Sequence, residues 1–253
     1  MNPSISVIIP AYNEEGNIVA AIESVIYALE GVSSDYEIIV IDDGSKDKTA
    51  PLARGKSAVN PSIRVVSNEG NQGYGYTFRR GIKLATKTYF TAFQGDNDMS
   101  RESFRELIGS LEKAQVVTSH MENKKSRSFL RRFLSQSFVR VMNILFRLRL
   151  KYYTGMFICE SRLVKSVALK SDGLVIVAEC LVRLIKAGSS YTSIAFKHVQ
   201  RQTGESKALT LKNIFSTLKI IFILVSDIYC KQSALDNPVL TTKKLPQEHT
   251  AGV

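Results

Sequence analysis

Short apolar segments alternate with amphipathic segments through the first 120 residues of the chain. The apolar segments are rich in β-branched residues and show little polar alternation, which is typical of parallel strands covered on both faces. The segments between them place apolar residues at helical spacing. This alternation predicts βαβ units and a doubly wound sheet. The expected strands are residues 5–9, 37–41, 63–66, 88–93 and 115–119, and the expected helices are 15–29, 47–56, 74–85 and 101–113.

The pattern changes in the second half. Residues 123–159 contain nine Lys or Arg and no Asp or Glu, interleaved with Phe, Leu and Ile. This composition predicts a basic amphipathic helix over residues 128–150, which either lies on an anionic membrane surface or packs against the core with a solvated basic face. The elements expected after it are a strand at 153–159, a helix at 174–187, a strand at 191–196, an apolar-rich helix at 210–229 and a flexible polar tail at 231–253.

The composition narrows the class of partner. The 253-residue chain carries a net charge of +11, which indicates an anionic partner such as nucleic acid, an acidic membrane surface or a phosphorylated substrate. Its three Cys and three His are scattered, so we expect neither a disulfide framework nor a zinc site, and a reducing, cytoplasmic location. No secretory signal and no uninterrupted apolar run of about 18 residues is visible, so no transmembrane span is expected.

Polar clusters follow three of the expected strands. P-A-Y-N-E-E comes after the first, D-D-G-S after the second and G-D-N-D after the fourth. Each cluster alone is compatible with a turn or a helix cap. Together they fall where open parallel sheets bind ligands, beyond the carboxyl ends of the strands. Crowded carboxylates repel one another unless a cation shares the site, and a divalent metal that bridges to a diphosphate suits such oxygen ligands. The carboxylates expected on this rim are Glu14, Asp42, Asp43, Asp96 and Asp98.

Two nucleotide-binding alternatives lack their motifs. P-A-Y-N-E-E-G-N after the first strand has no G-x-G-x-x-G pattern, which disfavours a Rossmann dehydrogenase, and the chain has no P-loop.

Four motifs in order resemble the family 2 glycosyltransferases of the GT-A fold. They are S-V-I-I-P-A-Y-N-E-E, I-V-I-D-D-G-S-K-D-K-T, N-Q-G-Y-G-Y-T-F-R-R-G-I and D-N-D. The similarity runs over residues 6–207 and is strongest to the dolichyl- or polyprenyl-phosphate mannosyl- or glucosyltransferase branch. It implies an α/β, Rossmann-like GT-A fold: a mostly parallel sheet flanked by helices, with basic amphipathic helices in the C-terminal half. We expect a single domain over residues 1–230, in which 1–120 bind the nucleotide-sugar and 121–230 face the acceptor and the membrane.

The resemblance also implies a function. A family member of this branch is a metal-dependent, inverting enzyme that moves a sugar from a UDP- or GDP-sugar to a polyprenyl or dolichyl phosphate, at the inner face of the membrane. Asp96 and Asp98 match the family's D-x-D motif, which holds Mg²⁺ or Mn²⁺ on the diphosphate and so neutralises charge on the leaving group. The residues implied for the nucleotide-sugar are Pro10, Tyr12, Glu14, Asp42, Asp43, Asn71, Gly73 and Arg79.

Basic motifs of the second half are implied to bind the acceptor phosphate. F-L-R-R-F-L-S offers either Arg131 or Arg132, with Ser135. R-Q-T-G-E-S-K matches the family's R-x-x-G-x-S-K loop, whose arginine suits bidentate phosphate contacts. The residues implied by this loop are Arg201, Gly204, Ser206 and Lys207.

The acceptor class decides whether a base is needed. A phosphate acceptor is already anionic near neutral pH, whereas a hydroxyl acceptor requires a general base, for which Glu179 in V-A-E-C-L-V is the candidate. Two rivals therefore stay open: transfer to a hydroxyl of a cell-surface glycan precursor, and a non-catalytic membrane- or nucleic-acid-binding protein. Nucleic acid is not expected, because the acidic rim would repel its phosphates. The chain departs from the branch at Met99 and Ser100, where relatives carry Leu-Gln, and at Met156.

Overall fold

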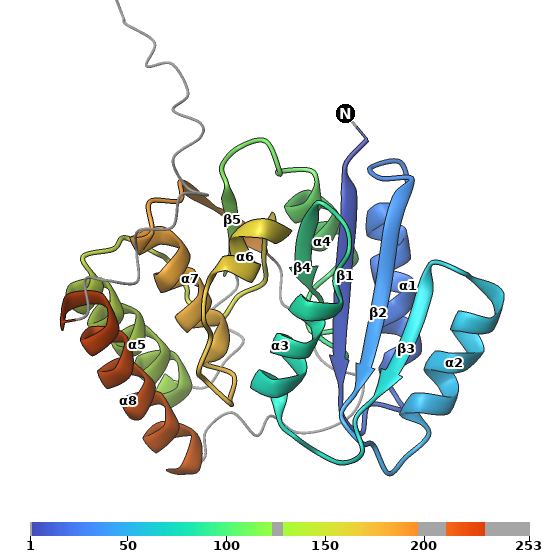
Figure 1. Ribbon diagram of the computed structural model, residues 1–253, viewed down its shortest axis with the longest axis horizontal. Helices are drawn as coiled ribbons and strands as arrows, with labels where there is room; N and C mark the ends of the chain where they lie inside the picture. Colours follow the sequence, from blue (N-terminus) through green and yellow to red (C-terminus); the bar gives the residue numbers. More distant parts are fainter. Residues whose placement is uncertain (1, 123–128, 197–210, 231–253) are drawn as a thin grey trace, which may run out of the picture.

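A central sheet organises the molecule (Figure 1). The computed structural model describes residues 2–122, 129–196 and 211–230, and within these ranges the sheet has seven strands in the order β3-β2-β1-β4-β6-β5-β7. All run parallel except β6, which pairs antiparallel with both β4 and β5. The predicted doubly wound, mostly parallel sheet is confirmed. The strands are β1 (Ser4–Ala11), β2 (Asp35–Asp42), β3 (Ile63–Ser67), β4 (Tyr89–Ala92), β5 (Val116–Met121), β6 (Phe157–Glu160) and β7 (Tyr191–Phe196).

Helices cover both faces of the sheet, and each face has its own apolar core. In β1, Ile8 packs into one core while Val7 and Ile9 pack into the other, which is why the strand is apolar without alternation. The first core, which contains Val7 and Ile9, is covered by α1 (Ile18–Leu29), α2 (Thr49–Val59) and α4 (Arg101–Ile108). The second core, which contains Ile8, is covered by α3 (Tyr74–Leu84), α6 (Ser161–Ser166) and α7 (Ile176–Lys186).

Two further helices lie side by side at one end of the molecule (Figure 1). They are α5 (Phe129–Phe146) and α8 (Leu211–Val225), and α8 continues into a π-helical turn, η2 (Ser226–Cys230). Met142 and Phe146 of α5 share the second core with Ile220 and Leu224 of α8. Among the described residues, no helix has the length and apolar character needed to cross a membrane.

Several element boundaries differ from those predicted. Helix α4 ends at Ile108, before Gly109, rather than at residue 113. Helix α5 ends at Phe146, because the Asn143 side chain bonds both the N–H and the carbonyl of Leu150 and so turns the chain back. The strand expected at 153–159 is the shorter β6, and the sequence indicated neither its antiparallel direction nor helix α6.

Glu37 links three segments at the amino-terminal end of the sheet, away from the predicted rim. Its carboxylate accepts hydrogen bonds from Ser6 Oγ at 2.7 Å and from the Thr86 N–H and hydroxyl at 2.6 and 2.8 Å. Burial raises the pKa of Glu37, but these hydrogen bonds outweigh it, and the net shift is downward.

We expect Glu37→Gln to lower the free energy of unfolding by about 1–2 kcal/mol at pH 7. Because the pKa of Glu37 is lower in the folded chain, its contribution is present above the unfolded-state pKa of about 4.3 and is lost as the pH falls through the folded-state value. The difference between wild type and variant in urea unfolding should therefore shrink below about pH 4. An equal difference at pH 7 and pH 3 would contradict this assignment.

Candidate active site

The polar loops predicted to form a rim at the carboxyl edge of the sheet are joined to one another by hydrogen bonds. The Asp43 N–H, just after β2, bonds the Ala11 carbonyl of β1 at 2.8 Å. The Gly95 N–H, after β4, bonds the Pro10 carbonyl at 3.2 Å. These contacts join the three polar clusters along the carboxyl edge of the strands, toward which the arrowheads of β1, β2 and β3 point in Figure 1.

The loop after β1 interlocks with the loop after β2. The Asn13 N–H bonds Ser45 Oγ at 2.9 Å, and the Glu14 N–H bonds Thr49 Oγ1 at 2.7 Å. The Glu14 carboxylate accepts a bond from the Asn17 amide at 2.7 Å. Pro10 is buried beneath the loop, whereas the Tyr12 side chain remains 36% exposed at its surface. Tyr12 thus offers an aromatic face beside the rim.

Two adjacent carboxylates after β2 have different surroundings. Asp42 is buried, and its Oδ1 accepts one bond from the Ser45 N–H at 3.1 Å. Asp43 is also buried, and its Oδ1 accepts bonds from the Asn68 amide at 2.6 Å and the Gln72 N–H at 2.9 Å, while Oδ2 accepts from the Gly73 N–H at 2.8 Å. Asp43 therefore holds the N-Q-G turn in place. The implied role of Asp42 in binding the nucleotide-sugar stays a prediction.

Two glycines shape this turn, residues 71–75, which we call the donor turn after the nucleotide-sugar contact that its motif implies. Gly73 has a φ of +87°, a conformation that disfavours other residues, and precedes the first residue of α3. Gly75 packs directly on the loop at residues 170–172, where an added Cβ would lie 2.4 Å from the Ser171 carbonyl oxygen. Arg79 bonds the Ser171 carbonyl and, at 2.9 Å, Asp172 Oδ1, and its contact with the nucleotide-sugar stays a prediction. These contacts fix the donor turn against the second half of the chain.

The D-N-D motif forms a tight turn after β4. Asp96 is buried, and Asn97 between the two carboxylates has a φ of +53°. Burial raises the pKa of the Tyr74 hydroxyl, and the negative charges of Asp96 and Asp98 raise it further, which places Tyr74 beside the motif. The sequence did not single out Tyr74, although it follows the Gly73 of the donor turn.

Met99 and Ser100, which differ from the Leu-Gln of the polyprenyl-phosphate branch, have structural roles. Met99 is 1% exposed and packs in the first core with Phe93 and Phe104. Ser100 is the N-cap of α4, and its hydroxyl accepts a bond from the Ser103 N–H at 3.2 Å. Met99 thus fixes the D-N-D turn to the core, and Ser100 begins the next helix.

The D-N-D turn fits a divalent metal that also binds substrate. In the described ranges, no group of three or more His, Cys, Asp or Glu side chains is placed to hold a metal by itself. Mg²⁺ is commonly held by one or two carboxylates together with substrate phosphates and water. Asp96 and Asp98 would provide these carboxylates, and Asn97 Oδ1 is a buried oxygen with no hydrogen-bond partner in the described part of the chain.

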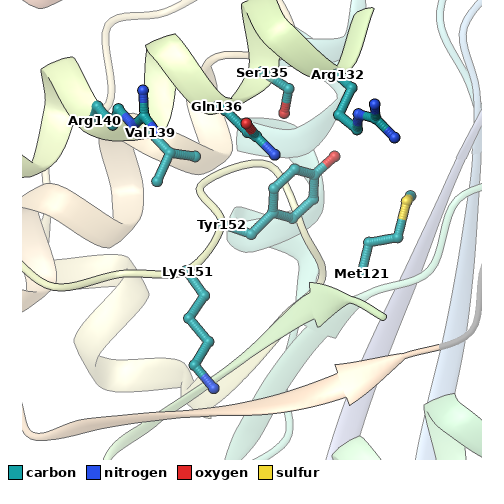
Figure 2. A pocket seen from close by; sticks show the side chains of 8 residues that line it. All are labelled: Met121, Arg132, Ser135, Gln136, Val139, Arg140, Lys151 and Tyr152. Carbon is teal, nitrogen blue, oxygen red and sulfur yellow. The ribbon is translucent and has the colours of Figure 1, made fainter. Parts of the chain in front are cut away.

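A basic pocket of about 250 Å³ opens on the same rim, beyond β5 (Figure 2). One face of α5 supplies Arg132 and Ser135, two of the predicted acceptor residues, together with Arg140. The Tyr152 hydroxyl is directed toward this helix, and Lys151 lies on the facing loop. Among the residues that the structure describes, none of those lining the pocket is acidic. They are Met121, Arg132, Ser135, Gln136, Val139, Arg140, Lys151 and Tyr152.

A smaller cavity lies between the basic pocket and the end of β4. Gly155, close to Tyr152, lines this cavity together with Gln94 and Tyr74, which belong to the strand end before D-N-D and to the donor turn. Cations and carboxylates thus lie on the same edge of the sheet, an arrangement that suits two phosphate-bearing ligands. The Arg131 side chain and residues Arg201, Gly204, Ser206 and Lys207 lie outside the described residues, so their implied roles stay predictions.

Glu179 is completely buried on α7. Both carboxylate oxygens accept bonds from the Lys170 N–H at 3.0 Å, and Oε1 also accepts from Arg183 Nε at 2.9 Å. A general base must reach a proton of the substrate. The contacts of Glu179 with its own chain and its lack of exposure favour a role in holding the loop at 170–172.

The doubly wound sheet and the polar loops at its carboxyl edge define the α/β class of protein that binds ligands beyond the strand ends. The fold is similar to that of glucosyl-3-phosphoglycerate synthase from Mycobacterium tuberculosis. The complex of that enzyme with uridine-diphosphate gives a TM-score of 0.67 at 19% identity, covering 89% of this chain and 80% of that one. Its complex with Mn²⁺, uridine-diphosphate and glucosyl-3-phosphoglycerate gives 0.64 with the same coverage. The predicted GT-A fold is confirmed.

The chain belongs to glycosyl transferase family 2, whose pattern matches residues 6–171. It is 29% identical over 229 residues to a dolichol-phosphate mannosyltransferase of Pyrococcus furiosus, covering 87% of this chain and 63% of that protein. It is 25% identical over 236 residues to an undecaprenyl-phosphate 4-deoxy-4-formamido-L-arabinose transferase of Edwardsiella ictaluri, covering 89% and 67%. With a dolichyl-phosphate beta-glucosyltransferase of Dictyostelium discoideum it shares 32% over 155 residues, covering 54% and 47%.

These relatives confirm the predicted similarity to the polyprenyl-phosphate branch. The chain spans between about half and two thirds of the length of these relatives.

Proposed function

We propose that this protein transfers a sugar from a nucleotide-diphosphate sugar to a polyprenyl phosphate, with inversion and with Mg²⁺ or Mn²⁺. The observation that carries the proposal is the location of the D-N-D turn, after β4, and of the basic pocket, beyond β5, on the same edge of the sheet. The relatives that act on dolichol- or undecaprenyl-phosphate, by their names, support the acceptor class. The UDP and Mn²⁺ in the similar solved structure support the donor and the metal.

The residues divide between the two substrates. Asp96 and Asp98 would hold the metal, which supplies positive charge to the departing nucleoside diphosphate. The donor turn and the loop after β1, with Tyr12, would seat the nucleotide. Arg132 and Ser135 would orient the acceptor phosphate so that its oxygen faces the sugar, because arginine binds phosphate with two parallel hydrogen bonds. The phosphate oxygen is already anionic, so no side chain has to remove a proton.

The outer surface of α5 and α8 has the exposed apolar residues expected of a surface that contacts a membrane. The α5 helix turns basic residues such as Arg132 toward the pocket, whereas several residues exposed to solvent are apolar. Tyr229, after α8, bonds the Leu145 carbonyl of α5 at 2.8 Å and joins the two helices. A lipid acceptor would reach the pocket from a bilayer that contacts this surface. The exposed apolar residues of this α5–α8 surface are Phe133, Leu134, Val141, Ile144, Leu145, Leu218, Phe222 and Tyr229.

We expect the double variant Ile144→Ser/Phe222→Ser to lower the partition onto anionic phospholipid vesicles by at least about tenfold, since each side chain would bury apolar area in the bilayer. These residues are 77% and 76% exposed, so the folded chain should be little affected. The measurement is co-sedimentation with vesicles of phosphatidylglycerol and phosphatidylcholine. Val59→Ser is the control, because Val59 is 81% exposed on α2. Equal binding by wild type and double variant would exclude this surface as the contact.

The proposed function is tested by thermal-shift screening of UDP- and GDP-sugars with and without Mn²⁺, followed by transfer assays. A ligand that binds the folded chain raises its apparent stability, so the true donor should raise Tm only with the metal present. Label should then move from that donor to a short-chain polyprenyl phosphate. Binding of DNA in place of any nucleotide-sugar would support the non-catalytic rival. Transfer to a glycan hydroxyl in place of the lipid phosphate would support the second enzyme reading.

A further inference from the structure

A chain of charged side chains connects η2, the continuation of α8, to the loop at residues 170–172. Glu179 Oε2 accepts bonds from the Ser171 N–H at 2.8 Å and the Ser171 hydroxyl at 2.6 Å, and the Lys170 N–H bonds the same carboxylate. Arg183, one helical turn further along α7, bonds Glu179 through Nε at 2.9 Å. The loop is therefore tied to α7 by hydrogen bonds from both its backbone and its side chain.

The same arginine reaches the C-terminal segment. Arg183 Nη2 bonds Asp227 Oδ2 of η2 at 2.8 Å, and Lys170 Nζ bonds that oxygen at 2.6 Å. Arg183 and Asp227 are each only 14% exposed in their side chains. The bonds from Lys170 and Arg183 lower the pKa of Asp227. The four side chains thus make one network, in which Arg183 lies between Glu179 and Asp227 and Lys170 pairs with Asp227.

The other side of the loop is pressed against the donor turn. The Gly75 N–H bonds the Asp172 carbonyl at 2.9 Å, and a Cβ at Gly75 would lie 2.5 Å from the Asp172 carbonyl carbon. Arg79 of α3 bonds both Ser171 and Asp172. A shift of the loop would therefore move the donor turn, since close-packed contacts of this kind transmit displacement.

We propose that Glu179, Arg183 and Asp227 are positioning residues that hold the loop at 170–172 against the donor turn and so set the conformation in which that turn receives the nucleotide-sugar. Glu179 has this role in place of proton abstraction. The binding part of this inference rests on the proposed function, whereas the mechanical part concerns the ligand-free chain.

The mechanical part is tested by hydrogen exchange in the full-length, ligand-free protein. Asp227→Asn should speed amide exchange in peptides that cover the donor turn and the loop, because the turn loses part of its support. The exchange rates of peptides that cover α2 should be unchanged. Asp227→Glu should restore the wild-type rate, and Asp35→Asn, which removes an ion pair at the opposite end of β2, is the matched control. Unchanged exchange at the donor turn in Asp227→Asn would overturn the proposal, whatever the protein binds.

The binding part is tested by steady-state kinetics with the donor found in the screen. Asp227→Asn and Arg183→Lys should raise the donor KM about threefold to thirtyfold, as residues of a coupling network do, while kcat at saturating donor and the acceptor KM are retained. Glu179→Gln should behave in the same way and keep the wild-type pH profile. Glu160→Gln, which removes the ion pair with Arg162, is its control.

One result would assign Glu179 as the base. If Glu179→Gln loses kcat by orders of magnitude, keeps the wild-type donor KM and loses the acidic limb of the pH profile, the positioning role is overturned. Failure of the wild type to bind any UDP- or GDP-sugar would instead contradict the proposed function, and the exchange experiment would still decide the mechanical part.

Discussion

Replacing Asp98 with alanine should reduce sugar transfer by at least about a hundredfold, because loss of a metal ligand removes several kcal/mol of charge stabilisation at the leaving diphosphate. Asp98 shares the turn after β4 with the buried Asp96, and both charges act on Tyr74. A second readout does not depend on turnover. The Mn²⁺-dependent rise in Tm that UDP or GDP gives the wild type should be absent in the variant.

Asp35→Ala is the matched control for Asp98→Ala. Asp35 is also a surface-accessible aspartate, 53% exposed, but it lies at the amino-terminal end of β2 and pairs with Lys87. The control should keep both transfer and the metal-dependent Tm shift. An Asp98→Ala protein with full activity and an undiminished Mn²⁺ effect would show that the D-N-D turn is not the metal site.

Asp43→Asn should lower the free energy of unfolding by about 2–4 kcal/mol. The carboxylate accepts three hydrogen bonds from the Asn68 amide and from the N–H groups of Gln72 and Gly73. An asparagine presents an NH₂ group where one carboxylate oxygen was, so it cannot accept all of them, and a buried donor left unsatisfied is costly. Urea unfolding at pH 7 measures the change, and nucleotide binding should weaken with it because the donor turn loosens.

Asp35→Asn serves here as the control, since it changes the same chemical group without touching the rim and should leave the free energy of unfolding nearly unchanged. If Asp43→Asn weakened nucleotide binding while the unfolding free energy stayed at the wild-type value, Asp43 would be a direct donor ligand instead of the support of the turn.

The sequence predicted where the acidic residues lie in the fold, but not which distant segments contact them. Asp96 and Asp98 lie together at the rim as expected, because the carboxyl ends of parallel strands meet at one edge. Arg79 bonds the loop at 170–172, a contact that the sequence did not indicate. That contact joins residues more than ninety positions apart, and such pairings leave no signal in local spacing.

The lining of the basic pocket likewise combines residues that local spacing predicts with residues that it does not. Arg132, Ser135 and Arg140 share one face of α5 at helical spacing, so the sequence could have grouped them once the helix was placed. Lys151 and Tyr152 come from the loop that follows, and their approach depends on the turn that Asn143 closes onto Leu150. Only the packed structure could add them to the pocket.

The sequence by itself determined the doubly wound sheet, the family and the acidic rim, because apolar periodicity and motif order are local properties that strand geometry translates directly into positions. The tertiary structure decided the direction of β6, the support that Asp43 gives the donor turn and the placing of Glu179. The direction of β6 depends on its pairing with β4 and β5, and the other two features depend on which distant backbone groups a buried carboxylate meets. Burial makes each unmet hydrogen bond costly, so the final partners are selected by the whole fold.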